Sequence, residues 1–220
     1  MKIAILTGAG ISAESGIQTF RDENGTWQNH DVQDVATAIA VKTNLHKVNS
    51  FYDARRRVLK QVEPNAAHLA LAELEKHHDV TIITQNIDDL HERAGSKNVI
   101  HIHGELKKIR KIDTNQVLET SEDVGLDPSI RPHVCLFGES PFFLHETMKA
   151  LYECDLFIAI GTSGNVSPAC YYIDKINHVV KVPSIEINIR ETAITSKFKR
   201  IIRGPATTAV AKLVEEFISK

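Results

Sequence analysis

Two histidines stand two residues apart in the segment HIHGEL, residues 101–106, at the end of an apolar run. Histidine is the side chain best suited to moving a proton at neutral pH, and it is also a common metal ligand. If the segment is a strand, His101 and His103 share one face, because side chains alternate along a strand. A metal site would need further ligands that nothing in the sequence brings together; the candidates are His133, His145 and His178. A catalytic base is the alternative.

Polar or glycine-rich loops follow other apolar runs. TGAGISAESG comes after KIAIL, and its Gly8 and Gly10 would allow a tight turn and close approach of the backbone to a phosphate, with the next helix pointing its N-terminus at the anion. The spacing is not the dinucleotide fingerprint G-x-G-x-x-G, so a strand-to-helix turn without a ligand is the competing interpretation.

Amide and carboxylate side chains follow the apolar run VTIIT. Gln85, Asn86 and Asp88 could hold ribose hydroxyls or an amide, or they could cap a helix. GTSGNVSPA after DLFIAI and RET after PSIEINI complete a set of four such loops. Because ligands bind beyond the carboxyl ends of the strands in an open α/β sheet, the four loops suggest one shared nucleotide site.

The elements that must position these loops alternate along the chain. Short apolar runs predict buried strands at 2–6, 80–84, 98–102, 155–160 and 183–189, and amphipathic stretches predict helices at 46–61, 65–78, 142–153, 168–178 and 206–219. This order predicts an α/β fold with a parallel sheet covered on both faces. Two segments do not fit it. Residues 18–63 lack a predicted strand, and 107–133 are polar, so we expect a small inserted lobe from about 31–62 and 107–133 within a single domain, 1–220.

Composition limits the partners and the compartment. The net charge of −2 over 220 residues provides no general field for nucleic acid or an anionic membrane, and Arg55-Arg56-Arg57 is the one dense basic run. No apolar run approaches the roughly 20 residues of a membrane helix. Cys135, Cys154 and Cys170 are too scattered for a disulfide framework, and MKIAILTGAG is unlike a signal peptide. We therefore expect a soluble cytoplasmic protein.

Taken together, these blocks resemble the sirtuins. GAGISAESGIQTFRDENGTW, TQNIDDLHERAG, HIHGEL, RPHVCLFGE, GTSGNVSPA and the INI near residue 188 occur in the family's order and at similar spacing. NSFYDARRR and PNAAHLAL look most like the CobB-type bacterial protein deacylases of that family.

The resemblance implies a Rossmann-type sheet domain, a small lobe and NAD between them. It also implies that NAD is consumed to remove acyl groups from protein lysines. In that chemistry the acyl oxygen attacks the ribose carbon that bears nicotinamide, a histidine acts as base on a ribose hydroxyl, and water releases the lysine and O-acyl-ADP-ribose.

The resemblance also assigns roles to residues. Cofactor positions are Gly8, Ala9, Gly10, Ser12, Phe20, Arg21, Trp27, Gln85, Asn86, Ile87, Asp88, Gly161, Thr162, Ser163, Asn188 and Ala206. The base matches His103, with Asn86 and Asp88 as catalytic neighbours, and Gly104 would leave room for the substrate; His101 would pack or cap. The strand that pairs with the substrate backbone by main-chain addition matches Val134, Leu136, Phe137, Gly138 and Glu139.

The chain departs from the family pattern at the structural zinc, which two cysteine pairs usually hold soon after the histidine motif. Lys111 stands near the first expected cysteine, and no cysteine occurs between residues 1 and 134, so four-cysteine coordination in the small lobe is impossible and no zinc is expected. Smaller departures are Gln18, where the family commonly has proline, and Leu136, where it often has an aromatic residue.

One further match concerns the acyl group. Tyr52 and Arg55 are three apart and share a helix face, and this Tyr-x-x-Arg pair resembles the signature of sirtuins that remove succinyl or malonyl groups. Ala36 matches the small residue that widens that pocket. The competing interpretation places Arg55 in a solvated basic run and Tyr52 in helix packing.

The leading hypothesis is an NAD-dependent deacylase of acetyl- and succinyl- or malonyl-lysine in proteins. The alternatives are an NAD-consuming ADP-ribosyltransferase or NAD hydrolase, and a non-catalytic NAD or ADP-ribose sensor. The presence of His103 with Asn86 and Asp88 argues against a sensor, since binding alone needs no base. The oligomeric state stays open.

Overall fold

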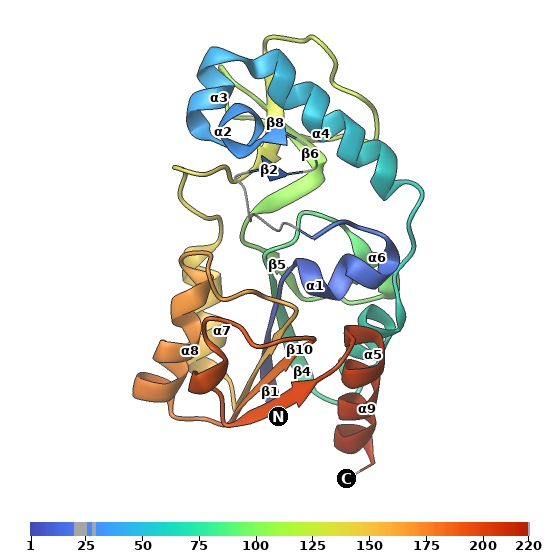
Figure 1. Ribbon diagram of the computed structural model, residues 1–220, viewed down its shortest axis with the longest axis vertical. Helices are drawn as coiled ribbons and strands as arrows, with labels where there is room; N and C mark the ends of the chain where they lie inside the picture. The colour runs from blue at the N-terminus through green and yellow to red at the C-terminus, as the bar shows by residue number, and fades with distance from the viewer. Residues whose placement is uncertain (20–25, 28–29, 220) are drawn as a thin grey trace.

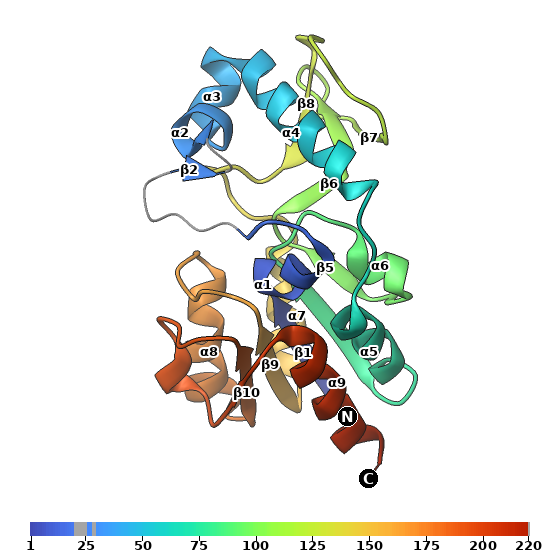
Figure 2. The same cartoon turned by 45° about the vertical axis from the view of Figure 1, so that its right-hand side comes forward.

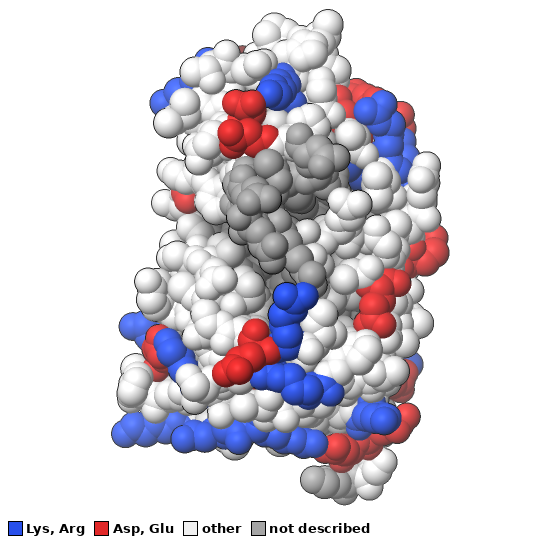
Figure 3. Space-filling view, viewed as in Figure 1, with Lys and Arg blue, Asp and Glu red and all other residues white. Residues whose placement is uncertain are grey.

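The computed structural model describes residues 1–19, 26–27 and 30–219. A larger lobe built on a parallel sheet lies below a smaller lobe, and both chain termini lie at the lower end of the molecule (Figure 1; Figure 2). The charged residues visible on this face are of both signs, with a row of Lys and Arg along the lower edge (Figure 3). Among the residues described, no helix combines the length and the apolar character needed to cross a membrane.

Six parallel strands form the sheet of the larger lobe in the order β11-β10-β9-β1-β4-β5. The chain builds outward from β1 through β4 to β5, then returns to the other side of β1 for β9, β10 and β11. The switch point therefore lies between β1 and β9, where open α/β sheets bind ligands. The strands are β1 (Lys2–Thr7), β4 (Asp79–Thr84), β5 (Val99–His101), β9 (Leu156–Ile160), β10 (Ser184–Asn188) and β11 (Arg200–Arg203).

Helices cover both faces of this sheet, as the alternation of apolar runs and amphipathic stretches predicts. Ile3 and Ile5 of β1 pack with α5 (Ala66–Leu74) and α9 (Ala206–Ile218), while Ala4 and Leu6 pack with α7 (Leu144–Glu153) and α8 (Tyr172–Lys175). Short helical segments are α1 (Ala9–Ser12), α6 (Leu90–Ala94), the 3-10 turns Ala13–Ser15, Ala169–Tyr171 and Thr195–Lys197, and a π turn, Ile176–Val180. The α/β fold class is confirmed.

The smaller lobe is an antiparallel sheet backed by helices. Its strands, in the order β7-β6-β8, are β6 (Gly104–Lys111), β7 (Val117–Glu119) and β8 (Ile130–Val134), and its helices are α2 (Val32–Val35), α3 (Ala38–Thr43) and α4 (Leu45–Leu59). A two-stranded ribbon, β2 (Thr26–Trp27) with β3 (His30–Asp31), lies in the segment that we expected to lack strands. β2, β3 and β7 are only two or three residues long, and β6 and β8 mix buried with more exposed residues, so none of them appears as a long apolar run in the sequence.

A buried ion pair ties α4 to the loop after β7. Asp53 and Arg56 are 3% and 2% exposed, and their side chains bond to each other. Asp53 also accepts the backbone N–H groups of Val124 and Gly125, both at 2.9 Å, and Arg56 donates to the Leu106 carbonyl at 3.0 Å. The pair thus joins a helix, a strand and a loop of the small lobe.

The competing interpretation, which places Arg55 in a solvated basic run, does not fit the structure. Arg55 is 8% exposed and Arg56 is buried, whereas Arg57 is exposed and pairs with Asp123 at 3.3 Å. The reason is that one face of α4 packs on the small-lobe sheet, and consecutive residues on a helix point in different directions.

Replacing Asp53 by Asn should therefore destabilise the protein strongly. The change keeps the shape but leaves the buried Arg56 guanidinium without its counter-charge, which costs about 3–5 kcal/mol. Urea unfolding of the whole chain measures this loss. Asp123→Asn makes the same chemical change in an exposed pair and should stay within about 0.5 kcal/mol of the parent. Equal losses in the two variants would refute the role of the buried pair.

Candidate active site

The loops predicted to carry chemistry meet at the carboxyl edge of the parallel sheet. The loop after β1 and the loop after β9 are in direct contact: Gly8 N–H donates to the Ile160 carbonyl at 3.0 Å, and Gly10 N–H donates to the Gly161 carbonyl at 2.9 Å. These contacts lie at the switch point of the sheet.

The glycines of these loops serve the contact between the loops. A Cβ on Gly10 would lie 2.6 Å from the Gly161 Cα, and one on Gly161, whose φ is +63°, would lie 2.5 Å from the Ile11 nitrogen. We expected Gly8 and Gly10 to admit a phosphate, but their Cβ positions face Gly161 and Thr162. The helix that follows Gly8 is α1, a single turn of four residues.

The segment after β4 is locked onto α1 by side-chain hydrogen bonds. Asn86 donates from Nδ2 to the Gly8 carbonyl at 3.2 Å and to Ser12 Oγ at 3.1 Å, and Ser12 donates to Asp88 Oδ2 at 3.1 Å. Ser12, Asn86 and Asp88 are 0%, 7% and 5% exposed. Burial raises the pKa of Asp88 to about 6, although the Leu90 N–H and the Ser12 hydroxyl work against the shift.

Two buried histidines that the sequence reasoning did not select lie behind this segment. His68 Nδ1 accepts from the Asn65 N–H, so its Nε2 carries the proton that faces Ser12 Oγ, 3.5 Å away. His91 lies edge-on to His68 and contacts Thr7 Oγ1 through Nε2 at 3.0 Å. Burial lowers the pKa of His68 to about 4 and the pKa of His91 well below its usual value. In the sequence these residues are the histidines of two motifs quoted above: His68 lies in PNAAHLAL and His91 lies in TQNIDDLHERAG.

A chain of contacts links the β4, β9 and β10 loops. Thr162 donates from Oγ1 to Gln85 Oε1 at 2.7 Å, and Asn188 donates from Nδ2 to the Thr162 carbonyl at 2.8 Å. Three of the predicted cofactor residues therefore form one connected row across the sheet edge. Ala9 is in α1, Ile87 packs partly into the small-lobe core, Ser163 follows Thr162, and Ala206 begins α9. Phe20 and Arg21 lie outside the described residues, and Trp27 lies in β2.

His103 is oriented by the same segment. Its Nδ1 lies 3.0 Å from the Gln85 carbonyl oxygen, which can only accept, so Nδ1 carries the proton and Nε2 keeps its lone pair. Burial lowers the pKa of His103, and the Gln85 carbonyl partly opposes this. A neutral ring with a free Nε2 lone pair is the form that a general base needs.

His101 has different surroundings. Its Nδ1 lies 3.2 Å from the Asn86 carbonyl oxygen and its Nε2 lies 2.7 Å from Glu92 Oε1. The strand β5 ends at His101, and residues 102–103 form a turn, so the argument from alternation along one strand does not apply to the pair. No group of three or more His, Cys, Asp and Glu side chains in the described part of the chain is placed to hold a metal.

Gly104 serves the packing of the small lobe. A Cβ there would lie closer than 3.0 Å to the His133 carbonyl oxygen, and the residue has a φ of +82°. Its absence of a side chain therefore lets β6 cross β8 closely beside His103. These contacts do not bear on the expectation that Gly104 leaves room for a substrate, which stays a prediction.

Residues 134–139, predicted to pair with the substrate, make several contacts within the protein. The Cys135 N–H donates to the His103 carbonyl at 2.8 Å, and Phe137 exchanges backbone bonds with Ala36 and Ala38 at 2.9 and 3.0 Å. Glu139 binds Arg131 through both oxygens, at 2.5 and 3.0 Å, and accepts the Leu136 N–H. Gly138, with a φ of +89°, makes the turn between them. Glu139 is thus held by the small lobe.

The predicted acyl-pocket residues share the small-lobe core. Ala36, Tyr52, Val134 and Leu136 belong to one buried cluster, and Tyr52 is 1% exposed. Burial raises the pKa of Tyr52 well above its usual value. Arg55 lies on the same helix, donates to the Phe51 carbonyl at 2.6 Å and lies over the Phe51 ring. Burial lowers the pKa of Arg55 to about 10, so the charge on this guanidinium is poorly solvated.

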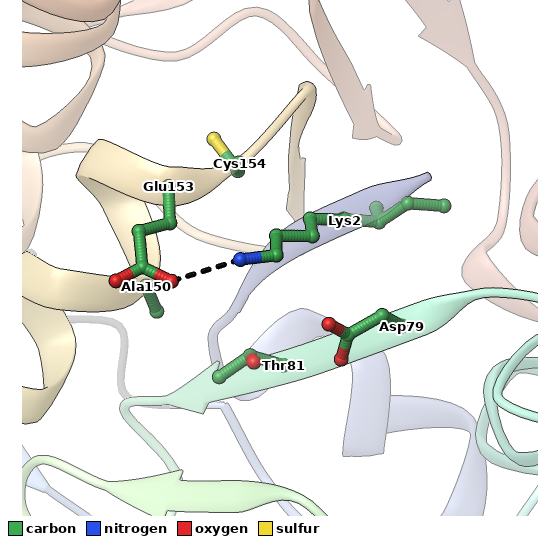
Figure 4. Close-up of a pocket in the computed structure, with 7 residues that line it drawn as sticks. Lys2, Asp79, Thr81, Ala150, Glu153 and Cys154 are labelled. Carbon is green, nitrogen blue, oxygen red and sulfur yellow. Dashed lines mark hydrogen bonds and ion pairs between the residues drawn. The ribbon is translucent and has the colours of Figure 1, made fainter.

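A pocket also opens at the opposite edge of the sheet, at the start of β1 and β4 (Figure 4). Lys2 crosses it and bonds to Glu153 at 3.0 Å, and both side chains are about half exposed. Asp79, Thr81 and Cys154 complete its wall. It lies at the amino ends of the strands, away from the loops that carry the predicted chemistry.

Comparison with known proteins agrees with this geometry. Residues 8–168 match the model of the Sir2 family. A protein from Vibrio parahaemolyticus serotype O3:K6, described as an NAD-dependent protein deacylase, is 47% identical over 99% of this chain and 95% of its own length. The chain belongs to the Sir2 family.

More distant members of the Sir2 family agree over the same extent. A Trypanosoma brucei brucei protein, described as the NAD-dependent protein deacylase SIR2rp3, is 45% identical over 98% of this chain and 94% of its own. The structure of a Sir2 homolog–NAD complex superposes with a TM-score of 0.89 at 35% identity, covering 99% of this chain and 89% of the other. A Sir2–p53 peptide–NAD+ complex gives 0.81 at 25% identity, covering 99% and 94%. The predicted family is confirmed.

Replacing Gly104 by Ala should cost far more stability than the same change at Gly125. Both have positive φ, +82° and +63°, but nothing lies within 4 Å of a Cβ on Gly125. Gly125→Ala therefore isolates the backbone cost of about 1–2 kcal/mol. Gly104→Ala adds the clash with His133 and should cost about 3 kcal/mol or more. Equal midpoint shifts in urea unfolding would show that the approach of β6 and β8 is not tight.

Proposed function

We infer that this Sir2 family member is an NAD-dependent protein deacylase, which releases nicotinamide, O-acyl-ADP-ribose and the free lysine. The observation that carries the inference is the row of side chains along the carboxyl edge of the sheet, which ends at His103. His103 has its proton on Nδ1 and its lone pair on Nε2, as a base needs. NAD-dependent protein deacylases that match this chain over nearly its whole length support the same activity.

The donor set at the sheet edge suits NAD as the co-substrate. The side-chain amides of Gln85 and Asn86 are groups that can bind ribose hydroxyls and a carboxamide. NAD supplies a ribose carbon that becomes electrophilic when nicotinamide departs. Asn86 and Asp88, held through Ser12, would shape the wall on that side, and Thr162 would orient Gln85.

We assign His103 the role of general base. The Gln85 carbonyl fixes the ring and its tautomer, and the lowered pKa keeps Nε2 unprotonated at neutral pH. A proton from a ribose hydroxyl would move to Nε2. The hydrogen bond from the Cys135 N–H to the His103 carbonyl would couple this ring to the segment proposed to pair with the substrate, residues 134–139.

We further propose that the substrate range includes acyl groups with a terminal carboxylate. Tyr52 and Arg55 lie on one helix face at the small-lobe core, where Ala36 leaves more space than a larger side chain would. A succinyl or malonyl carboxylate would restore solvation to a guanidinium whose pKa burial lowers to about 10. Acetyl-lysine would use the same pocket without this contact.

The small lobe is proposed to fold without zinc, as a part of one domain that spans residues 1–220. The chain has no cysteine before Cys135, and the buried pair Asp53 and Arg56 joins α4 to β6 and to the loop after β7. Urea unfolding of the parent should therefore have the same midpoint with and without a chelator. The three cysteines are free, which fits a reducing, cytoplasmic environment.

Replacing His103 by Ala should lower the deacylation rate about 10²–10⁴-fold, the usual contribution of a general base. The readout is loss of acyl mass from an acetyl-lysine peptide, with and without NAD. NAD binding, followed by calorimetry, should change little. Nicotinamide release by the parent without any peptide would favour an NAD hydrolase, and transfer of ADP-ribose to protein would favour a transferase. Binding of NAD without any turnover would favour a sensor.

Replacing Arg55 by Met should lower kcat/KM for succinyl peptides about 10–100-fold, because a hydrogen bond to a charged group is worth ~1.5–3 kcal/mol. The rate with acetyl peptides should hold or rise, and Tyr52→Phe should act in the same direction more weakly.

The control for Arg55→Met is Arg57→Met on the exposed side of the helix. Arg56 does not serve as a control, because it is buried with Asp53. A uniform loss on both acyl groups in Arg55→Met would assign the residue to the fold. Equal losses for succinyl peptide in Arg57→Met would indicate diffuse charge attraction.

A further inference from the structure

The role of general base accounts for His103 of HIHGEL but not for His101, the other histidine of this segment. His101 is 5% exposed, yet both of its ring nitrogens face oxygen acceptors: the Asn86 carbonyl at 3.2 Å and Glu92 Oε1 at 2.7 Å. A neutral imidazole carries one N–H, so it can satisfy only one of the two. The protonated ring satisfies both.

The two histidines hold consecutive carbonyls of one segment. His103 bonds to the Gln85 carbonyl and His101 to the Asn86 carbonyl. Glu92 lies on α6, which begins at Leu90 directly after this segment. The bridge from Glu92 through His101 to the Asn86 carbonyl therefore braces residues 85–89, which connect β4 to α6. The side-chain amide of Asn86 makes separate contacts with Gly8 and Ser12.

We propose that His101 is a positioning residue, which acts as an imidazolium bridging Glu92 and the Asn86 carbonyl and so holds Asn86 and Asp88 in their working positions. The proposal rests on the deacylase function inferred above. His101 touches neither substrate nor NAD in this role, and its effect passes through the backbone of Asn86.

The electrostatics of the bridge agree with this role. Burial lowers the pKa of His101, but the hydrogen bond and charge of Glu92 outweigh it, so the net pKa is raised. Burial likewise opposes ionisation of Glu92, but His101 brings its net pKa below the usual value. The other charged or titratable groups that act on the pair are Glu105 and Lys108 of β6, Asp88 of the segment itself and His91 of α6.

The sign of the pH dependence follows from the raised pKa. The bridge is complete below the unfolded-state pKa of the ring and is lost as the pH rises through its folded-state pKa. At that point one of the two hydrogen bonds breaks. Activity should therefore have an acid limb from His103, whose pKa is lowered, and an alkaline limb from His101.

The test is the pH profile of kcat/KM with an acetyl-lysine peptide and NAD, measured for the parent and for Glu92→Gln. The amide removes the counter-charge of His101, and an opposite charge at this distance moves a pKa by about one unit or more. The alkaline limb should move to lower pH by about one unit. Glu63→Gln is the matched control. Glu63 pairs with Arg93 of α6, the helix that also carries Glu92, but it does not touch His101. The pH profile of Glu63→Gln should equal that of the parent.

A second variant and a direct titration complete the test. His101→Gln keeps one donor but cannot titrate, so its alkaline limb should disappear. NMR titration of the His101 ring without substrates should give a pKa above the ordinary 6.5 in the parent and a lower one in Glu92→Gln. A ring pKa below 6.5 in the parent would overturn the proposal, as would an alkaline limb that stays in place in both variants or moves equally in Glu63→Gln. A parent that binds NAD but never deacylates would refute the proposed function, while the NMR titration would still test the bridge.

Discussion

The contact between the loops after β1 and β9 sets the geometry of everything built on the sheet edge. Neither Gly10 nor Gly161 has a side chain, so the two backbones lie closer than residues with a Cβ atom would permit. In this arrangement Thr162 donates a hydrogen bond to Gln85, and the Gly8 carbonyl accepts one from the Asn86 amide. The row of polar groups at this edge depends on backbone proximity first and on side-chain chemistry second.

A second layer of constraint comes from the buried groups behind the row. Ser12 accepts from Asn86 and donates to Asp88, while His68 presents its Nε2–H side to the same hydroxyl. Each partner fixes the direction of the hydroxyl proton, so Ser12 has one arrangement and not several. Such a network transmits small displacements, and this is why we place His101, which holds the carbonyl of Asn86, among the residues that matter for turnover.

The sequence predicted the parallel sheet well and the small lobe poorly. β1, β4 and β9 are continuous apolar runs because helices bury both of their faces. In β6 the buried Leu106 and Ile109 are separated by charged, partly exposed residues, so the strand resembled a polar loop. The burial of Arg56 is not visible in the sequence, because its partner carbonyl at Leu106 lies fifty residues away. The close approach of the His133 carbonyl to Gly104 is likewise not visible in the sequence, because only the fold brings the two segments together. Side chains at the ends of strands were found from sequence, but the carbonyls that orient both histidines could not be.

The ion pair that joins α4 to the loop after β7 has a consequence for how the protein withstands chemical stress. Thiolates that hold a metal are targets for peroxide, nitrosating agents and heavy-metal ions, and a lobe that relies on them comes apart when they react. This chain has no cysteine thiol before Cys135, and a carboxylate bonded to a guanidinium does not oxidise. The small lobe should therefore keep its shape during an oxidant burst that would release the metal from a cysteine-bound site.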